Sequence, residues 1–415
     1  MLSQQRFSTD FDSLLQTLIE TPNLLIIQDL DGVCMPLVRD PLTRELAPHY
    51  VQAASLLKPN FFVLTNGEHI GSRGVNSLVD KAMEGRMSSD SARHYLPGLA
   101  AGGVQWQDHF GTVNHPGVSE EELAFLNEAP ARMRNALSSL LQQAPYALST
   151  AETDSLLSVV ILDNPVSPTI NINGFHSFMQ LDAAKLRSLQ QSVETIMLQL
   201  MDDARQHGLG DSFFIHYAPN LGSGPDGERI KWARDEDTGT TDFQFMLRGA
   251  VKEVGVLVIL NRYYHQVTGE YPLGQAFNAR QAPRDLQAQL QLARDHFDPD
   301  IMPRIIGVGD TVTSQPDPYN SGEYLRGGSD RGFLTLVQEL GKCFQTDNGV
   351  LFVDSSGGEL NRPSIRVEAL QQMPWQAVAG ITDRDDPLQL NVVFPQGHRQ
   401  YVDFFCQLAN ARQGN

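Results

Sequence analysis

Four short apolar runs, each ending in a polar or glycine-containing turn, constrain the fold of this chain most strongly. They are LLIIQD (24–29), FFVLTNG (61–67), IIGVGDT (305–311) and VLFVDSS (350–356). Their length and their content of β-branched residues are typical of strands that are buried on both faces of a parallel sheet. Helical patterns lie between them, such as HYVQAASLL (49–57) and FLTLVQELG (333–341). The sequence therefore predicts an α/β fold, with a Rossmann-like parallel sheet and helices on both of its faces.

The middle of the chain has a different pattern. From residue 119 to about residue 210, long stretches of helical periodicity alternate with strand-like segments. This pattern predicts an inserted α+β unit at 119–242, which separates two parts of the main unit, 1–118 and 243–415.

Two connections in the main unit also have recognisable patterns. The segment GVQWQDHFGTV (103–113) is expected to form a hairpin that closes the first part of the main sheet. Residues 315–330, which are rich in Pro, Gly, Asn and Ser, are expected to form a long loop. Ligands of open parallel sheets bind beyond the carboxyl ends of the strands, so the turns DLDG, TNGE and GDT should meet at one edge.

The overall charge excludes several kinds of partner. The chain has 415 residues and a formal net charge of -18. Such a surface repels nucleic acid and anionic membranes, so we expect neither as a partner. No stretch approaches the ~20 apolar residues of a membrane-spanning helix, and the N-terminal residues lack the pattern of a signal peptide. The three cysteines, Cys34, Cys343 and Cys406, have no metal-binding spacing, which fits the cytoplasm as the expected location.

Two carboxylates stand two residues apart at the end of the first apolar run, in DLDG (29–32). Asp and Gly are turn formers, so a simple turn explains the pair as well as a catalytic role does. A calcium loop of the EF-hand type is excluded because Val33, at its fifth position, offers no side-chain oxygen. In the catalytic interpretation, Asp29 attacks phosphorus, while Asp31 protonates the leaving oxygen and then activates water. A Mg²⁺ ion would relieve the repulsion between the two charges.

Three further elements offer polar groups in a fixed order along the chain. Thr65 and Asn66 follow the second apolar run and can hold phosphate oxygens, although an Asn-Gly turn also accounts for them. Lys252 lies near the start of a predicted helix, where it can pair with a phosphate, although a lone lysine is usually a surface residue. Asp310 follows the third run and offers the oxygen ligand that Mg²⁺ prefers.

The order of these elements, DxDG, Thr-Asn, Lys and Gly-Asp, resembles the haloacid dehalogenase-like phosphohydrolase superfamily. The resemblance implies that Asp29 is the nucleophile and that Asp31 is the general acid and base. It also implies that Thr65 and Lys252 bind phosphate. Asp310 would hold Mg²⁺ together with Asp29 and the main-chain carbonyl of Asp31. An insert between the second and third motifs is the position of the larger cap type of this superfamily, which occurs in sugar phosphatases.

The last motif departs from the pattern of many relatives, which carry a second acidic residue about four positions after the first. Here that position is Ser314. We expect the segment after it to be an insertion, and Asp330, which opens a helical pattern, to take the second acidic role at the metal. A Ser–Asp helix cap explains Asp330 nearly as well.

Within this superfamily, the chain resembles one family in particular, the cyanobacterial glucosylglycerol-phosphate phosphatases. Segments such as QDLDGVCMPLV, YLPGLAAGGVQWQD and DFQFMLRGAVKE carry this resemblance, which extends over nearly the whole chain. It implies a Mg²⁺-dependent phosphatase that releases glucosylglycerol, a salt-protective compatible solute. It also suggests the glucosylglycerol-phosphate synthase as a partner. The alternatives are a trehalose- or sucrose-phosphate phosphatase, and a non-catalytic regulator of the same fold that binds a sugar phosphate.

Selection of a sugar requires groups that bind hydroxyls, because a phosphate site alone does not choose among sugars. We expect these groups in the inserted unit, beside the phosphate loop and near the return to the main unit. The candidates are Glu68, His69, His216, Tyr217, Asn220, Trp232, Asp237 and Thr241, and Arg248, close before Lys252, could add positive charge. A structural role explains each of them at least as well.

Overall fold

The computed structural model describes residues 1–84, 94–178, 182–224, 227–318 and 320–414. Its larger sheet has the strand order β16-β15-β12-β1-β2-β3-β4-β5, in which β16 to β3 run parallel and β4 and β5 are antiparallel. The strands are β1 (Leu24–Gln28), β2 (Phe61–Leu64), β3 (Gly98–Ala100), β4 (Gln105–Gln107), β5 (Val113–Asn114), β12 (Arg304–Gly309), β15 (Gly349–Val353) and β16 (Val392–Phe394). The four apolar runs form β1, β2, β12 and β15, and the predicted hairpin forms β4 and β5, so the predicted α/β sheet is confirmed.

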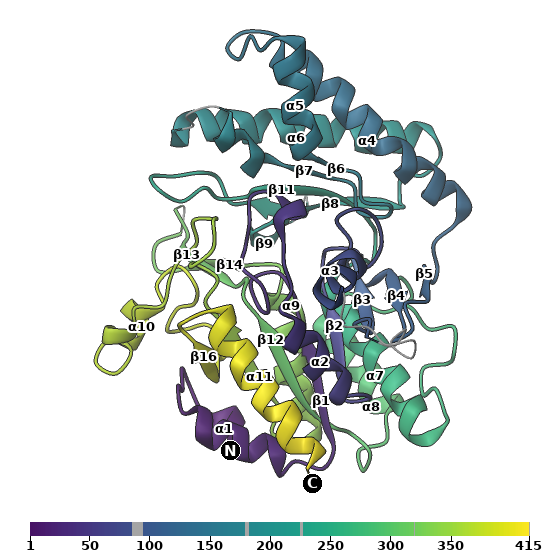
Figure 1. Ribbon diagram of the computed structural model, residues 1–415, viewed down its shortest axis with the longest axis vertical. Helices are drawn as coiled ribbons and strands as arrows, with labels where there is room; N and C mark the ends of the chain where they lie inside the picture. The colour runs from purple at the N-terminus through teal and green to yellow at the C-terminus, as the bar shows by residue number, and fades with distance from the viewer. Residues whose placement is uncertain (85–93, 179–181, 225–226, 319, 415) are drawn as a thin grey trace.

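Helices cover both faces of the larger sheet, as predicted (Figure 1). One face carries α1 (Phe11–Ile19), α2 (Pro48–Leu56), α3 (Val75–Met83) and α11 (His398–Gln413). The other face carries α7 (Lys252–Thr268), α8 (Leu286–His296) and α9 (Arg331–Phe344).

The side chains of β1 show how this three-layer packing follows from the sequence. Leu24 and Ile26 are buried in the core on one face, and Leu25 and Ile27 in the core on the other. Successive side chains of a strand point to opposite faces, so a continuous aliphatic run contributes to both cores. Each buried side chain of this size contributes about 1.5–3 kcal/mol of hydrophobic free energy. The end of β1, and therefore Asp29, is fixed by packing on both sides.

A smaller sheet lies apart from the larger one, with the strand order β6-β7-β11-β8. Its strands are β6 (Ile161–Leu162), β7 (Thr169–Asn171), β8 (Phe213–Ala218) and β11 (Asp242–Leu247). One face is covered by α4 (Glu120–Leu141), α5 (Thr150–Val160) and α6 (Ala183–Gln206), which lie above it in Figure 1. Capping boxes at Ser119 and Ser149 begin α4 and α5, because each serine side chain satisfies a free backbone N–H of the first turn.

The predicted end of the inserted unit, at residue 242, is too early. Strand β11 pairs with β7 and β8, so residues 243–247, which were predicted to belong to the main unit, are part of the smaller sheet. The chain returns to the main unit only with α7. The sequence could not show this, because cross-strand pairing decides which sheet takes a strand and has no local signal in the sequence. The division of the chain into these units otherwise remains a prediction.

Two hairpins connect the units. They are formed by β9 (Asn220–Gly224) with β10 (Gly227–Ile230), and by β13 (Thr313–Pro316) with β14 (Tyr324–Gly327). The prediction of a long loop at 315–330 is therefore wrong in part, because residues at both of its ends pair as strands. The main-chain carbonyl of Asn220 accepts a hydrogen bond from the Thr313 hydroxyl at 2.7 Å, which joins the two hairpins.

The remaining helices are short. They are η1 (Leu2–Gln4), η2 (Pro41–Thr43), η3 (Ala101–Gly103), η4 (Ile172–Ser177), η5 (Val367–Ala369) and α10 (Pro374–Ala377). Among the described residues, no helix combines the length and the apolar character needed to span a bilayer.

Candidate active site

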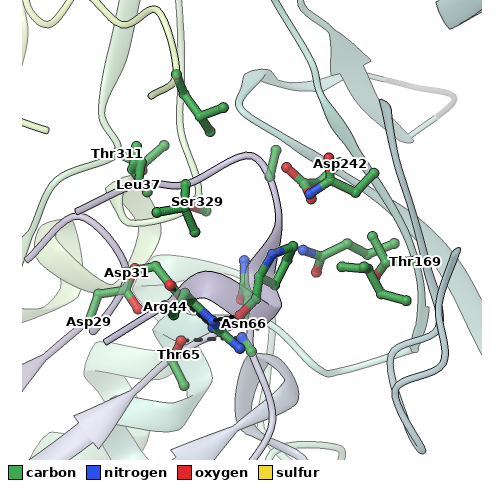
Figure 2. A pocket seen from close by; sticks show the side chains of 18 of the residues that line it. Asp29, Asp31, Leu37, Arg44, Thr65, Asn66, Thr169, Asp242, Thr311 and Ser329 are labelled. Carbon is green, nitrogen blue, oxygen red and sulfur yellow. Dashed lines mark hydrogen bonds and ion pairs between the residues drawn. The ribbon is translucent and has the colours of Figure 1, made fainter. Parts of the chain in front are cut away.

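The ends of three neighbouring strands of the larger sheet face the smaller sheet across a cavity of about 150 Å³. Asp29 follows β1, Thr65 follows β2 and Asp310 follows β12. Since β1 lies between β2 and β12, these side chains converge at one edge, as the parallel arrangement predicts. Figure 2 shows Asp29 and Thr65 on one side of the cavity, and Asp242 and Thr169 of the smaller sheet on the other.

Lys252 is buried at the first residue of α7 and makes two ion pairs. Its Nζ lies 2.7 Å from Oδ2 of Asp29 and 2.7 Å from Oδ1 of Asp330. Burial by itself lowers the pKa of Lys252, but the two carboxylates outweigh it and raise the pKa above its usual value. Burial raises the pKa of Asp29 to about 7, although the charge of Lys252 lowers it. Lys252 is therefore part of the site and not a solvated surface residue.

Asp330 holds the loop that carries Asp310. Its Oδ2 accepts hydrogen bonds from the backbone N–H groups of Asp310 and Thr311, both at 2.9 Å. Its Oδ1 is engaged by Lys252. The side chain of Asp330 makes no capping hydrogen bond to α9, so a simple helix cap does not describe it. Both of its oxygens have protein partners, and direct contact of Asp330 with a metal remains a prediction.

One carboxylate oxygen of the cluster is unpartnered among the described residues. Oδ2 of Asp310 is buried and accepts no hydrogen bond from any of them. Burial, together with the charges of Asp330 and Asp29, raises the pKa of Asp310 well above its usual value. Oxygens of these three carboxylates lie within 4.8 Å of one another. Among the residues that the structure describes, only Lys252 forms an ion pair with the cluster, so negative charge is in excess. Oxygen ligands in this arrangement fit Mg²⁺.

Asp31 differs from Asp29 in its exposure to water. The side chain of Asp31 is 31% exposed and pairs with Arg44, whereas Asp29 as a whole is 6% exposed. Both line the cavity. A buried carboxylate suits a nucleophile, and a water-accessible one suits proton exchange, and these two roles remain predictions.

Thr65 and Asn66 both line the cavity. The Thr65 hydroxyl accepts a hydrogen bond from the N–H of Gly67 at 3.2 Å, which shapes the loop. Nδ2 of Asn66 lies 2.9 Å from Nε2 of His216. Nδ1 of His216 lies 2.8 Å from Oε1 of Glu228. His216 thus connects the smaller sheet to the predicted phosphate loop, and it does not line the cavity itself.

The two residues that follow this loop are held by the protein. Glu68 lines the cavity, but its Oε1 accepts hydrogen bonds from the backbone N–H of Val166 and the hydroxyl of Ser167, both at 2.8 Å. Glu68 therefore fastens the larger sheet to the segment before β7. His69 is completely buried and does not line the cavity.

The other predicted sugar-binding residues do not reach the cavity. Tyr217 packs edge-to-face against Phe243 at 5.6 Å, in the core between the smaller sheet and its helices. Arg248 pairs with Asp211 at 3.4 Å on the surface. Four more candidates are also absent from the cavity lining, namely Asn220, Trp232, Asp237 and Thr241.

Sequence reasoning missed several polar lining residues, among them Arg44, Asp242, Gln244 and Arg362. Asp242 and Gln244 are two residues apart on β11, so the period of two residues along a strand places them on one face. That signal was present, but the predicted boundary separated the two residues, with Asp242 in the inserted unit and Gln244 in the main unit. Arg44 and Arg362 lie in irregular segments, and the sequence of these segments does not indicate where the two side chains lie in the folded protein.

Comparison with known proteins identifies the family. Among solved structures, the C-terminal domain of the Candida albicans trehalose-6-phosphate phosphatase gives a TM-score of 0.49 at 12% identity, and 98% of each chain is covered. An Aspergillus fumigatus trehalose-6-phosphate phosphatase gives 0.40 at 9% identity, covering 98% of this chain and 99% of the other. A glucosylglycerol-phosphate phosphatase of Synechocystis sp. is 51% identical over 418 residues, covering 100% of this chain and 99% of that protein. The glucosylglycerol-phosphate phosphatase family matches residues 23–409, so this chain belongs to that phosphatase family.

Proposed function

We propose that this protein is a Mg²⁺-dependent phosphatase that hydrolyses 2-O-(α-D-glucosyl)-sn-glycerol 3-phosphate to glucosylglycerol and phosphate. The observation that carries this proposal is the 51% identity to the Synechocystis phosphatase over the full length. That length includes the smaller sheet and its helices, where recognition of the sugar is expected. The convergence of Asp29, Thr65, Lys252 and Asp310 on one cavity supports chemistry at phosphorus.

The proposed reaction has two halves. In the first, a carboxylate oxygen of Asp29 attacks phosphorus and forms an aspartyl-phosphate, while the bond from phosphorus to the glycerol oxygen breaks. Asp31 donates a proton to that leaving oxygen. In the second, Asp31 accepts a proton from a water molecule, which attacks phosphorus and releases phosphate from Asp29. Lys252, beside Asp29, balances the charge of the transferred group throughout.

Asp29 and Asp310 would hold Mg²⁺, together with the main-chain carbonyl of Asp31 that the resemblance implies. The unpartnered Oδ2 of Asp310 is the group that most needs a cation. When bound, the ion would neutralise negative charge on the phosphate oxygens. Asp330 lies within reach of the same position but already has protein partners.

We propose that the smaller sheet with its helices acts as a cap over the cavity and selects the sugar. Closure over the substrate would keep bulk water from the first half-reaction. The product is a neutral polyol of the kind that serves as a compatible solute. We therefore propose that the reaction contributes to salt protection and takes place in the cytoplasm. The phosphorylated precursor requires a synthase, which is a proposed partner.

The direct test is a substrate panel. Phosphate release should be measured from glucosylglycerol 3-phosphate, trehalose 6-phosphate and sucrose 6-phosphate at equal concentrations, with and without a chelator. We expect the first substrate to be hydrolysed fastest and the chelator to stop hydrolysis. Asp29→Asn should abolish it while the protein stays folded. Faster release from either disaccharide phosphate would overturn the substrate assignment, and no release from any of them would favour a non-catalytic binder.

A further inference from the structure

The face of the smaller sheet that looks into the cavity is polar. Strand β11 places Asp242 opposite Asn171 of β7, and Gln244 opposite Thr169. All four residues line the cavity. Because side chains two residues apart share one face of a strand, this sheet presents a polar ceiling, defined by these four residues, above the phosphate site. Figure 2 shows Asp242 and Thr169 across the cavity from Asp29 and Asp31.

The ceiling contains a buried acceptor without a partner. Oε1 of Gln244 is buried and makes no hydrogen bond with any residue that the structure describes. The hydroxyl of Thr169 is already used, since it donates to the carbonyl of Ser167 at 2.7 Å. Asp242 accepts one hydrogen bond, from the Thr241 hydroxyl at 3.0 Å, and burial raises its pKa to about 6. Buried polar groups are normally satisfied, so an unpartnered one at the wall of a cavity indicates a ligand.

Donors of the matching kind come from the larger unit. Arg362 lines the same cavity, and its Nε and Nη1 atoms are buried without a hydrogen-bond partner in the described part of the chain. The carboxylates that act on its charge are those of Asp242, Asp310 and Asp237. Its segment is anchored close by, because the N–H of Ile365 donates to Asp354 at 2.6 Å. The charge of Arg362 is thus influenced both by Asp310 at the phosphate site and by Asp242 in the ceiling.

Unpartnered acceptors and donors together favour a polyol. A sugar hydroxyl can donate to Gln244 or Asp242 and accept from Arg362 at the same time. A second anionic group would meet the carboxylate of Asp242, and an apolar group would leave all of these atoms unsatisfied. Leu162 and Leu360 also line the cavity and offer apolar contact for the C–H groups of a pyranose ring. The donors, acceptors and apolar groups of this part of the wall thus match a glycosyl unit.

We propose that Gln244, Asp242 and Arg362 form the glycosyl subsite of this enzyme, which binds the glucosyl hydroxyls across the cavity from the reacting phosphate. This inference rests on the proposed function and names the residues that would select the substrate. They are specificity residues, because they contact the sugar and take no part in the transfer of phosphate.

The test compares two substrates that share the same phosphate ester. Glucosylglycerol 3-phosphate carries the glucosyl unit, and glycerol 3-phosphate lacks it. The measured quantity is kcat/KM for glucosylglycerol 3-phosphate divided by kcat/KM for glycerol 3-phosphate. For Gln244→Leu and Arg362→Met we expect this ratio to fall about tenfold, through a higher KM for the glucosylated substrate. Inhibition by free glucosylglycerol should weaken in parallel. Gln199→Leu and Arg234→Met, at exposed positions, are the matched controls and should keep the ratio.

The outcomes separate this subsite from the proposed function. If both kcat/KM values fall together in variants whose circular dichroism and Tm are unchanged, the subsite is wrong and the phosphatase assignment stands. If the unmodified protein hydrolyses glucosylglycerol 3-phosphate no faster than glycerol 3-phosphate, no glycosyl subsite exists. If it hydrolyses trehalose 6-phosphate and not glucosylglycerol 3-phosphate, the proposed function fails, and the subsite for this sugar fails with it.

Discussion

The guanidinium of Arg44 lies directly against the carboxylate of Asp31. Its Nη1 is 2.9 Å from Oδ2 and 3.2 Å from Oδ1. Arg44 is itself fixed, because its Nε donates to the carbonyl of Pro41 at 3.0 Å and its Nη2 to the carbonyl of Arg73. The arginine therefore orients the proposed acid and base of the reaction, although it lies 13 residues further along the chain.

Removing this contact should slow the chemical step more than it weakens binding. We expect Arg44→Met to lower kcat about tenfold, with a smaller change in KM, because the carboxylate of Asp31 would no longer be held in one orientation. Steady-state kinetics with glucosylglycerol 3-phosphate measures both constants. Arg39→Met, at an exposed position nearby, is the control. A rise in KM at constant kcat would show instead that Arg44 binds the phosphate.

Gly32 can be tested as the residue that leaves room for the proposed metal ligand. It has a φ of +81°, and a Cβ at this position would lie 2.2 Å from Oδ2 of Asp310. We expect Gly32→Ala to lower the free energy of unfolding by more than about 3 kcal/mol and to abolish activity. Gly208→Ala is a matched control, because Gly208 has a φ of +77° with nothing within 4 Å. Gly208→Ala should lower the free energy of unfolding by only about 1–2 kcal/mol, through left-handed strain. Equal losses of unfolding free energy in the two variants, measured by urea unfolding, would contradict the predicted clash.

Asp330 can be tested as a support of Lys252 and of the Asp310 loop. Since both of its oxygens have protein partners, we expect Asp330→Asn to lower kcat at least about tenfold, with little change in the Mg²⁺ concentration that gives half-maximal activity. A titration of activity with Mg²⁺ measures both quantities. A large increase in the Mg²⁺ requirement, with kcat restored at saturation, would identify Asp330 as a direct metal ligand.

Glu68 should make stability depend on pH. Burial raises the pKa of its carboxyl to about 7, despite the donors at Val166 and Ser167. The folded state then holds this proton more tightly than the unfolded chain, so the stability it contributes is complete below the unfolded pKa and is lost as pH rises through about 7. Relative to Glu68→Gln, the unmodified protein should lose up to about 3 kcal/mol of unfolding free energy between about pH 5 and about pH 8.

Urea unfolding at the two pH values measures this difference. Glutamine resembles the neutral carboxyl, so the variant should lack the pH-dependent contribution. Glu120→Gln, at an exposed position in the first turn of α4, should behave like the unmodified protein. Parallel changes of stability with pH in the Glu68→Gln variant and the unmodified protein would show that Glu68 does not titrate in this range.

The sequence by itself determined the larger sheet and the meeting point of its motif residues. Aliphatic runs as in β1 bury side chains on both faces, which only a covered parallel sheet allows. Parallel strands place all their carboxyl ends at one edge, so Asp29, Thr65 and Asp310 had to converge once those runs were recognised as strands. These inferences rest on local composition and on a general rule of topology, and a single sequence contains both.

The tertiary structure alone decided which side chains complete the site. The pairing of β11 with β7 and β8 turned Asp242 and Gln244 toward the cavity and left Tyr217 in the core behind them. Arg44, which contacts Asp31, and Arg362, which lines the cavity, are both positioned by irregular segments of the chain. Contacts of this kind join residues that are distant in the sequence, and their formation depends on the packing of whole units. Periodicity and spacing reflect only the local structure of residues that are close in the sequence, so they cannot predict these contacts.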